Sequence, residues 1–584
     1  MRKLLAIGMV LTALLALLTG PASAGDPPWV ARARGGMVAS DSPEASRIGA
    51  AVLAGGGNAF DAAVATSLAL AVARPQSTGL GGGGFLVAYV AREGRFVALD
   101  YRETAPASAT PQRFARLDKQ RGDGPAPSVY GGNAVAVPGL VAGLAEINRR
   151  WGTRPLRELT APAIELAERG FVVDDHFVGA CREVLADFGK WPVLTRQCRR
   201  MHEFVKREVA HGQRLKRPAL AEALRLLASD GPAAFYQGEI GQAIVRAVNA
   251  AGGELTLDDL RGYRVVERRP LVGRYFTRRG NFTIVSMPPP SSGGVCLIEM
   301  FNILEAARQR PDAAAIGRWH LLTEALKHAF ADRARWLGDP DRADLPVARL
   351  TSKGYATELA ARIDPQRTRP PEYYGSGPPA RDGGTSHFCV VDRWGNIVSI
   401  TETINGLFGS LVVAEPYGII LNNEMDDFLT VPGKANMFGL RQSQANLVGP
   451  GRRPLSSMAP TIVLRYGDAG GGRQTPEGRP VLVIGAAGGP RIISAVFNVT
   501  LAVIERQDLP AAMQRPRLHH QWRPDRVYFD RSPPSDAVAE LERCGHTIAR
   551  KRKGGVVQAI ELRPDGELIG VSDPAKGGRP AGVD

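Results

Sequence analysis

One stretch of the chain, residues 383–410 (GGTSHFCVVDRWGNIVSITETINGLFGS), gathers hydroxyl and amide side chains in a pattern suited to nucleophilic chemistry. Two strand-like runs, HFCVVD and IVSITET, flank Arg393-Trp394-Gly395, which has the length of a three-residue hairpin loop. Glycine occupies the last loop position, where a left-handed backbone is wanted. A hairpin symmetric about residue 394 pairs Val390 with Val398. The sequence therefore predicts both a hairpin and its register.

This register decides what lies around the residue that follows Gly384. It places Thr385 opposite Thr403, and directly opposed residues project from one face of a sheet. Asn405, two residues further on, is expected on the same face. A slip of one residue would turn these side chains to the other face. The hairpin thus predicts two hydroxyls and an amide beside Gly384.

A threonine hydroxyl is a poor nucleophile unless a base removes its proton. No histidine stands in an evident Ser/His/Asp arrangement, and His387 suits a strand position equally well. The other available base is the α-amino group of Thr385, which appears once the preceding peptide bond is cut; its reference pKa of about 8 suits proton transfer at neutral pH. Gly383 and Gly384 give the backbone freedom for the hydroxyl to attack its own preceding carbonyl. From the hairpin alone, a Thr385 that only begins a strand stays an open alternative.

The elements that must position the hairpin are mainly helical before it and mainly strands after it. Ser42 and Asn58 are typical N-caps, and the helices they begin are expected to end at the glycines 55–57 and before Pro75. The runs FLVAYV and RFVALDY follow as strands, and residues 138–270 are mainly helical. Beyond residue 385 come several strands and one long helix, RIISAVFNVTLAVIE. This order predicts helices layered on stacked sheets.

The glycine-rich run at residues 79–84 (GLGGGG) formally matches the dinucleotide-binding pattern GxGxxG. It follows a helix rather than a strand, and no βαβ unit surrounds it, so the match is weak. We expect a tight loop in which glycines adopt positive φ, and no dinucleotide site.

Residues 1–24 have the features of a secretory signal peptide. Arg2 and Lys3 precede an apolar run that ends at Leu18, and Ala22-Ser23-Ala24 forms a cleavage pattern. The apolar run is too short to span a bilayer, and no later segment is apolar enough. We therefore expect a mature protein that begins near Gly25 and is periplasmic or secreted, without stable membrane insertion.

The composition argues against two classes of ligand, nucleic acids and metal ions. The formal net charge is +15, but the basic residues are scattered and are not interleaved with aromatic side chains, which argues against nucleic-acid binding. The five cysteines (181, 198, 296, 389 and 544) have no metal-ligand spacing, and the sequence contains no HExxH or CxxC, so no metal is expected. Cys181 and Cys198 are close enough in sequence to form a disulfide; the alternative is that all five thiols are reduced and buried.

A series of motifs in order along the mature chain carries a resemblance to a known family. They are GMVAS, GGNAFDAAVATSLAL, GLGGGGF, DYRETAPASA, VAVPG, SMPPPSSGG, WLGDPD, GTSHFCVVD, NNEMDDF, GPGRRPLSSMAPTIV, GAAGGPRII and HHQW. The chain resembles the γ-glutamyltransferases (γ-glutamyltranspeptidases) of the N-terminal-nucleophile hydrolase superfamily. The resemblance implies an α+β fold, a four-layer αββα sandwich. It also implies a precursor that cleaves itself between Gly384 and Thr385 into an associated large chain (25–384) and small chain (385–584).

The resemblance assigns the chemical step to four residues. It implies that Thr385 is both the self-processing residue and the catalytic nucleophile, with Thr403 hydrogen-bonded to it. Gly488 and Gly489 match the glycines of the family's oxyanion hole. They stand between a strand and a helix that begins near Pro490, where free N–H groups are expected to point outward.

Substrate recognition is implied for a second set. Glu424 and Asp427 match the acids that bind the substrate ammonium, assisted by Asn405, and their spacing puts both on one side of a helical turn. Arg102 matches the arginine that binds the substrate carboxylate, for which a planar guanidinium is well suited. Ser456 and Ser457 add hydroxyl donors to the same carboxylate.

The implied reaction needs no cofactor. Thr385 attacks the γ-glutamyl amide of glutathione or a similar compound, and water, an amino acid or a peptide resolves the resulting ester. A stretch from about Thr430 to Gly439 resembles a lid loop, with Phe438 at its tip where some relatives carry Tyr; the missing hydroxyl predicts a looser lid.

The sequence leaves two alternative functions open. A glutaryl-cephalosporin acylase shares fold, cleavage and nucleophile, but its substrate lacks the α-amino group, so it has less need of the Glu424–Asp427 pair. A non-catalytic periplasmic protein of the same fold would stay a single intact chain.

Overall fold

The computed structural model describes residues 25–207, 209–374, 384–434, 436–440, 443–467, 474–505, 507–550 and 554–584. The predicted signal peptide, residues 1–24, and part of the segment that precedes the hairpin, residues 375–383, lie outside the described residues. Among the described residues, no helix combines the length and the apolar character needed to cross a membrane.

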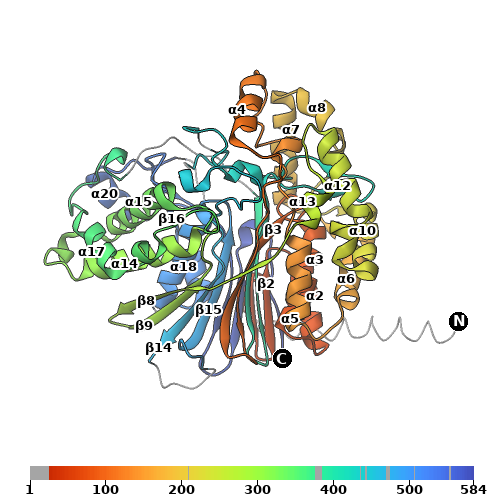
Figure 1. Ribbon diagram of the computed structural model, residues 1–584. Helices are drawn as coiled ribbons and strands as arrows, with labels where there is room; N and C mark the ends of the chain where they lie inside the picture. Colours follow the sequence, from red (N-terminus) through yellow and green to blue (C-terminus); the bar gives the residue numbers. More distant parts are fainter. Residues whose placement is uncertain are drawn as a thin grey trace.

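Two seven-stranded sheets form the centre of the molecule (Figure 1). Every pairing between neighbouring strands in them is antiparallel. The first sheet has the order β1 (Val30–Ala33), β19 (Leu568–Ser572), β18 (Val556–Leu562), β15 (Arg479–Ala487), β14 (Thr461–Tyr466), β9 (Gly280–Ser286), β8 (Leu271–Thr277). The second has the order β20 (Ala581–Val583), β2 (Gly36–Ser40), β10 (Gly384–Asp392), β11 (Ile397–Asn405), β3 (Gly83–Val90), β4 (Arg95–Tyr101), β7 (Val266–Arg268).

The two sheets pack face to face, with β10 lying against β15 and β18. Helices cover both outer faces (Figure 1). One group lies over the first sheet: α14 (Gly293–Arg308), α15 (Arg318–Trp336), α17 (Lys353–Ala361), α18 (Arg491–Ile504) and α20 (Ser535–Arg543). The other lies over the second sheet: α2 (Pro43–Ala54), α3 (Ala59–Ala73), α5 (Leu140–Trp151), α6 (Leu156–Arg169) and α10 (Pro218–Asp230). The predicted αββα sandwich is confirmed.

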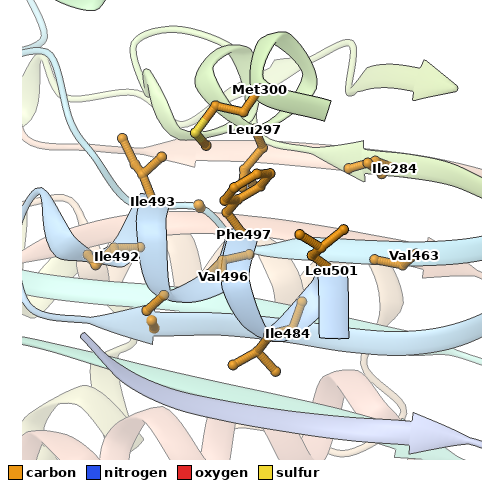
Figure 2. Close-up of a cluster of buried hydrophobic side chains, with 14 of the residues drawn as sticks. Ile284, Leu297, Met300, Val463, Ile484, Ile492, Ile493, Val496, Phe497 and Leu501 are labelled. Atoms are coloured by element: carbon orange, nitrogen blue, oxygen red, sulfur yellow. The ribbon is translucent and has the colours of Figure 1, made fainter. Parts of the chain in front are cut away.

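Apolar side chains fill the space between the first sheet and its helices. Figure 2 shows Phe497 and Leu501 of α18 between Leu297 of α14 and the sheet residues Val463 and Ile484. Burial of a large apolar side chain of this kind stabilises a fold by about 1.5–3 kcal/mol. The layer therefore fixes the start of α18, which follows Gly488 and Gly489, relative to the sheets.

The helix starts predicted from the sequence are confirmed. Ser42 caps α2, and Asn58 forms a capping box with Asp61 at the start of α3. All fifteen residues of α3 are buried, since the helix packs between α2, α6 and the second sheet. A sequence that is apolar on every face is what such a site requires.

The prediction for the glycine-rich run is wrong in its physical reason. None of the glycines at 79 and 81–84 has a positive φ. They are needed because other backbone passes close by: a Cβ on Gly81 would lie 2.3 Å from the Ile420 carbonyl oxygen, and one on Gly82 would lie 2.1 Å from that of Thr403. The glycines thus let the strand that carries Thr403 approach closely.

Candidate active site

The predicted hairpin forms with the predicted register. Strands β10 and β11 pair Val390 with Val398 and Thr385 with Thr403, and Gly395 in the loop has a φ of 96°. A bulge between Gly384 and Thr385 then sets Gly384 opposite Asn405. The hairpin lies in the middle of the second sheet, between β2 and β3, so its register is held from both sides.

Two hydroxyls converge on the carbonyl oxygen of Gly384. Thr385 Oγ1 donates to it over 2.8 Å and Thr403 Oγ1 over 2.7 Å, and the two hydroxyl oxygens are 3.3 Å apart. Thr385 is only 5% exposed. A Cβ on Gly384 would lie 2.7 Å from the Gln76 carbonyl oxygen, so only glycine fits before the threonine. The geometry polarises the one carbonyl that the Thr385 hydroxyl would have to attack.

His387 takes no part in this arrangement. Its ring nitrogens contact Thr401 Oγ1 at 2.8 Å and Cys389 Sγ at 3.2 Å, inside the sheet sandwich. Gly485 of the facing sheet makes room for the ring, since a Cβ there would lie 2.2 Å from it. Burial lowers the pKa of His387 to about 3. A buried neutral imidazole whose two nitrogens are engaged by Thr401 and Cys389 does not serve as the base of Thr385.

Lys576 is a neighbour of Thr385 that the sequence reasoning missed. Its ammonium donates to the carbonyl oxygen of Thr385 over 2.6 Å and lies 3.5 Å from Asp41 Oδ2. The side chain is 5% exposed, and burial lowers the pKa of Lys576. A buried positive charge therefore lies next to the residue whose amine is the expected base.

The predicted acidic turn is confirmed as a short 3-10 helix, Glu424–Asp427 (η4). Arg102, at the end of β4, contacts both acids: Nη1 lies 2.7 Å from Glu424 Oε2 and Nη2 lies 2.6 Å from Asp427 Oδ2. Its Nε donates to the Pro454 carbonyl oxygen over 3.2 Å. Burial opposes the charged guanidinium, but the charges of the neighbouring acids outweigh it and raise the pKa of Arg102. The structure thus brings together three of the predicted substrate-binding residues.

This cluster holds more acid than base. Glu103, which follows Arg102 in the chain, is fully buried 3.7 Å from the guanidinium, and neither of its carboxylate oxygens makes a hydrogen bond within the described residues. Burial raises the pKa of Glu103 to about 8 and that of Asp426 to about 7. Burial likewise raises the pKa values of Glu424 and Asp427. Three carboxyl groups, those of Glu103, Glu424 and Asp427, therefore lie within 4 Å of one guanidinium, which leaves acid in excess around it.

Asn405 connects the acidic turn to the threonine hairpin. Its Nδ2 donates to the Asn423 carbonyl oxygen over 3.0 Å, and its backbone N–H donates to Thr403 Oγ1 over 2.8 Å. Asn405 has a φ of 72°, a left-handed conformation that asparagine tolerates better than most residues. The strand thereby turns out of the sheet toward Glu424, and the predicted threonine and acid sites form one region.

Ser456 and Ser457 lie beside the proline-rich turn at residues 288–292. The Ser456 carbonyl oxygen accepts from the backbone N–H and the hydroxyl of Ser292, over 2.8 and 2.6 Å. Ser456 Oγ accepts from the Met458 N–H over 3.1 Å. Ser457 Oγ lies 3.5 Å from Nη2 of Arg333, a second residue that the sequence reasoning missed.

Gly488 and Gly489 form the predicted turn between β15 and α18. Their φ angles, 124° and 57°, are both in the range that favours glycine. Within the described residues, neither N–H takes part in a hydrogen bond. A helix that begins at Arg491 follows them, so these N–H groups are free to bind a negatively charged oxygen.

Phe438 covers this turn. A Cβ on Gly489 would lie 3.3 Å from its ring, and Phe438 is 3% exposed. Asn436 ties the same stretch to the acidic turn, because its Nδ2 donates to Asp427 Oδ1 over 3.0 Å. The lid position predicted for residues 430–439, of which residue 435 is not described, therefore joins the acid cluster to the glycine turn; the looser lid stays a prediction.

The cysteines and a histidine-rich cluster are not among the residues predicted for this site. All five cysteines are free and buried, so Cys181 and Cys198 are not bridged. His320, Glu324 and His546 lie within metal-binding reach of one another. Their atoms already bind each other and nearby residues: His320 Nδ1 lies 2.7 Å from His546 Nε2, and Thr368 Oγ1 donates to Glu324 over 2.7 Å. The cluster is a hydrogen-bonded network between α15 and the C-terminal part of the chain.

Comparison with known proteins agrees with the sequence resemblance. The family model described as Gamma-glutamyltranspeptidase matches residues 45–583. A glutathione hydrolase proenzyme from Escherichia coli (strain K12) is 39% identical over 548 residues, covering 93% of this chain and 91% of the relative. An acylase ACY 1 proenzyme from Pseudomonas sp. (strain SE83) is 38% identical over 560 residues, covering 94% and 93%.

The crystal structure of a cephalosporin acylase from Bacillus halodurans is similar over 97% of this chain and 99% of its own, with a TM-score of 0.79 and 27% identity. The fold is therefore that of the N-terminal-nucleophile hydrolases. Taken with the threonine hairpin and the acid cluster beside it, these matches show that the chain belongs to the γ-glutamyltranspeptidase family.

Proposed function

We propose that this family member cleaves the γ-glutamyl amide of glutathione and related compounds, with Thr385 as nucleophile, and passes the γ-glutamyl group to water or to an amino acid or peptide. The observation that carries the proposal is the buried cluster of Arg102, Glu424 and Asp427, which Asn405 joins to the Thr385–Thr403 pair. A γ-glutamyl group ends in an ammonium and a carboxylate, so its site needs charges of both signs close together.

The precursor would first cut itself between Gly384 and Thr385. Thr385 Oγ1 attacks the Gly384 carbonyl carbon, the C–N bond breaks, and the acyl group passes from nitrogen to oxygen as an ester. Water then hydrolyses the ester and leaves a free carboxylate on Gly384 and a free amine on Thr385. The hydroxyl of Thr403, 2.7 Å from the Gly384 oxygen, is placed to stabilise the negative charge that develops there. The products are a large chain, 25–384, and a small chain, 385–584.

The mature site would use the new amine as its base. The amine takes the proton of Thr385 Oγ1 while the oxygen attacks the γ-carbonyl carbon of the substrate. The N–H groups of Gly488 and Gly489 would bind the resulting oxyanion. The protonated amine then returns its proton to the leaving amine, and a γ-glutamyl ester remains on Thr385. Water or an acceptor amine resolves that ester by the same steps in reverse, without a cofactor.

Recognition of the γ-glutamyl end follows from the charge balance. Glu424 and Asp427, with Asn405, would bind the substrate ammonium, which offsets the excess of acid around Arg102. Arg102, Ser456 and Ser457 would bind the carboxylate. Because both charged groups of the substrate are matched, a ligand that lacks either one leaves buried charge unpaired, at a cost of several kcal/mol.

The chain is further proposed to act outside the cytoplasm, in the periplasm or after secretion. The support is the signal-peptide pattern of residues 1–24. The N-terminal sequence of the protein recovered from its native compartment tests this, since it should begin near Gly25.

An assay with two anilides separates the proposed activity from its nearest competitor. The similarity to named acylases makes glutaryl transfer the second candidate. The purified protein is given γ-glutamyl-p-nitroanilide and glutaryl-p-nitroanilide, with Thr385→Ala as the inactive control. We expect the γ-glutamyl compound to be turned over at least about tenfold faster, because only it carries the ammonium. Faster turnover of the glutaryl compound would overturn the substrate assignment.

A further inference from the structure

Arg333, on the inner face of α15, is a buried arginine that none of the assigned roles includes. It is 1% exposed. Its Nε donates to Ser292 Oγ over 3.0 Å, and its Nη2 lies 3.5 Å from Ser457 Oγ. Burial lowers the pKa of Arg333, whereas the negative charge of Asp427 acts in the opposite direction. The guanidinium therefore lies at the edge of the proposed carboxylate site.

Each of the three side-chain nitrogens of Arg102 already has a partner in the protein. Its two terminal nitrogens contact Glu424 and Asp427, and its Nε bonds to Pro454, so its charge is matched by acids of the protein itself. Arg333 differs, because its Nη1 is buried and makes no hydrogen bond within the described residues. Its positive charge is the less compensated of the two, and an arriving carboxylate is attracted by the charge that remains uncompensated.

Arg333 also determines how the two serines are presented. Ser292 Oγ accepts from Arg333 and donates to the Ser456 carbonyl oxygen, which fixes the backbone of the serine pair. A hydroxyl oxygen that accepts from a guanidinium has its own hydrogen directed elsewhere. Ser457 is thereby held as a donor, which is the role that binding of a carboxylate requires, and the nearby charge strengthens that donor.

We propose that Arg333 is a positioning and specificity-determining residue for the α-carboxylate of the substrate, acting through Ser457 and supplying the second positive charge of that site. This proposal rests on the proposed function, because it assumes a substrate that bears this carboxylate. It predicts that Arg333 matters for ligands with an α-carboxylate and not for ligands that lack only that group.

Two anilides that differ in this one group test the proposal. The first is γ-glutamyl-p-nitroanilide and the second is 4-aminobutanoyl-p-nitroanilide, which keeps the amine and lacks the carboxylate. In Arg333→Met, we expect kcat/KM for the first to fall about 10- to 100-fold, mainly through KM, the usual size of a lost charged hydrogen bond. For the second, we expect a change of less than about threefold, since it makes no such bond. Arg333→Lys, which keeps the charge, should lie between Arg333→Met and the wild type.

A double-mutant cycle supplies the control for action through Ser457. In a Ser457→Ala background, Arg333→Met should cost less than in the wild type, because the hydroxyl it orients is gone. Inhibition by L-glutamate and by 4-aminobutanoate gives a second readout that needs no turnover: only glutamate should lose affinity.

The outcomes separate the two proposals. A wild type that does not cleave the γ-glutamyl anilide sinks the proposed function. A wild type that cleaves it, with Arg333 variants that lose equal factors on both anilides and on both inhibitors, shows a merely structural arginine and overturns this inference alone.

Discussion

Two buried arginines, Arg517 and Arg102, each lie between two carboxylates, yet their surroundings differ in one respect. Arg517 contacts Asp530 through Nε and Asp573 through Nη2, both at 2.6 Å. The free oxygens of these acids are also bonded: Asp530 Oδ1 accepts from the Arg517 N–H over 2.8 Å, and Asp573 Oδ1 accepts from the Ala575 N–H over 3.0 Å. Every carboxylate oxygen of this cluster therefore has a partner within the protein.

In the Arg102 cluster, by contrast, some carboxylate oxygens have no hydrogen-bond partner within the described residues. Besides Glu424 and Asp427 it contains Glu103, whose two oxygens are buried and make no hydrogen bond within the described residues. Buried polar groups in proteins are nearly always hydrogen-bonded, so an exception needs an explanation, and a ligand that binds there is one. The comparison teaches that the number of charges does not distinguish a structural cluster from a functional one; the balance of donors and acceptors does.

The largest difference is expected in kcat/KM, between a variant of Asp427 and a variant of Asp530. Asp427→Asn should lower kcat/KM for γ-glutamyl-p-nitroanilide about 100-fold or more, because the substrate ammonium loses its charged partner. Asp530→Asn should leave kcat/KM per folded molecule unchanged. Steady-state kinetics on both variants measures this, and equal activity losses would contradict the comparison.

The same two variants should separate in stability, in the opposite order. Asp530→Asn breaks a buried and fully paired cluster and should lower the free energy of unfolding by about 3–5 kcal/mol. Asp427→Asn removes one of several crowded acids and should cost less. Chemical unfolding followed by circular dichroism gives the two free energies. If Asp427→Asn were less stable than Asp530→Asn, the proposed difference between the two clusters would be wrong.

Lys576 offers a smaller, pH-dependent test. Its ammonium, 2.6 Å from the Thr385 carbonyl oxygen, should lower the pKa of the nearby α-amine and keep more of it neutral. In Lys576→Met the acid limb of the kcat/KM profile should move up by about one pH unit, which is about a tenfold loss at pH 7. Lys576→Arg keeps the charge and should keep the limb in place. An unmoved limb in Lys576→Met would show that the lysine does not act on the amine.

The last effect concerns Glu103 and acts on stability rather than on activity. Its pKa is raised from 4.5 to about 8, so between these values the folded state binds a proton that the unfolded state does not. The stability of the wild type should therefore fall as pH rises through this window, whereas Glu103→Gln should lack this loss. One unit of pKa difference corresponds to about 1.4 kcal/mol, so the gap should reach at most a few kcal/mol above pH 8. Thermal unfolding across pH 5–9 measures it, and parallel curves would contradict the raised pKa.

The local sequence pattern was sufficient to predict the hairpin and the residues that it brings together. A three-residue loop with glycine at its end sets the register, and the register places Thr385 opposite Thr403. The acidic turn followed from the spacing of Glu424 and Asp427. In both cases the residues that meet are close in the chain, so short-range geometry determines the contact.

The residues that were missed come from distant segments. Arg333 lies in the last turn of α15 and Lys576 ends the short 3-10 helix Pro574–Lys576 before β20, and each reaches the site only through the packing of the layers. Nothing in their local sequence separates them from surface residues. Glu103 had a signal, since it directly follows Arg102, but its burial could not be predicted without the sheet. The glycine run was misinterpreted because close approach of backbone, rather than local φ, requires glycine at 81 and 82.

The proposed chemistry depends on a threonine that supplies both the nucleophile and, after the chain is cut, the base. The most direct test is the mass and N-terminal sequence of the fragments of the purified, active protein under denaturing conditions. Two fragments are predicted, the smaller beginning with Thr385-Ser386-His387, and Thr385→Ala should give one uncut, inactive chain. An active protein that is intact between Gly384 and Thr385 would contradict the account.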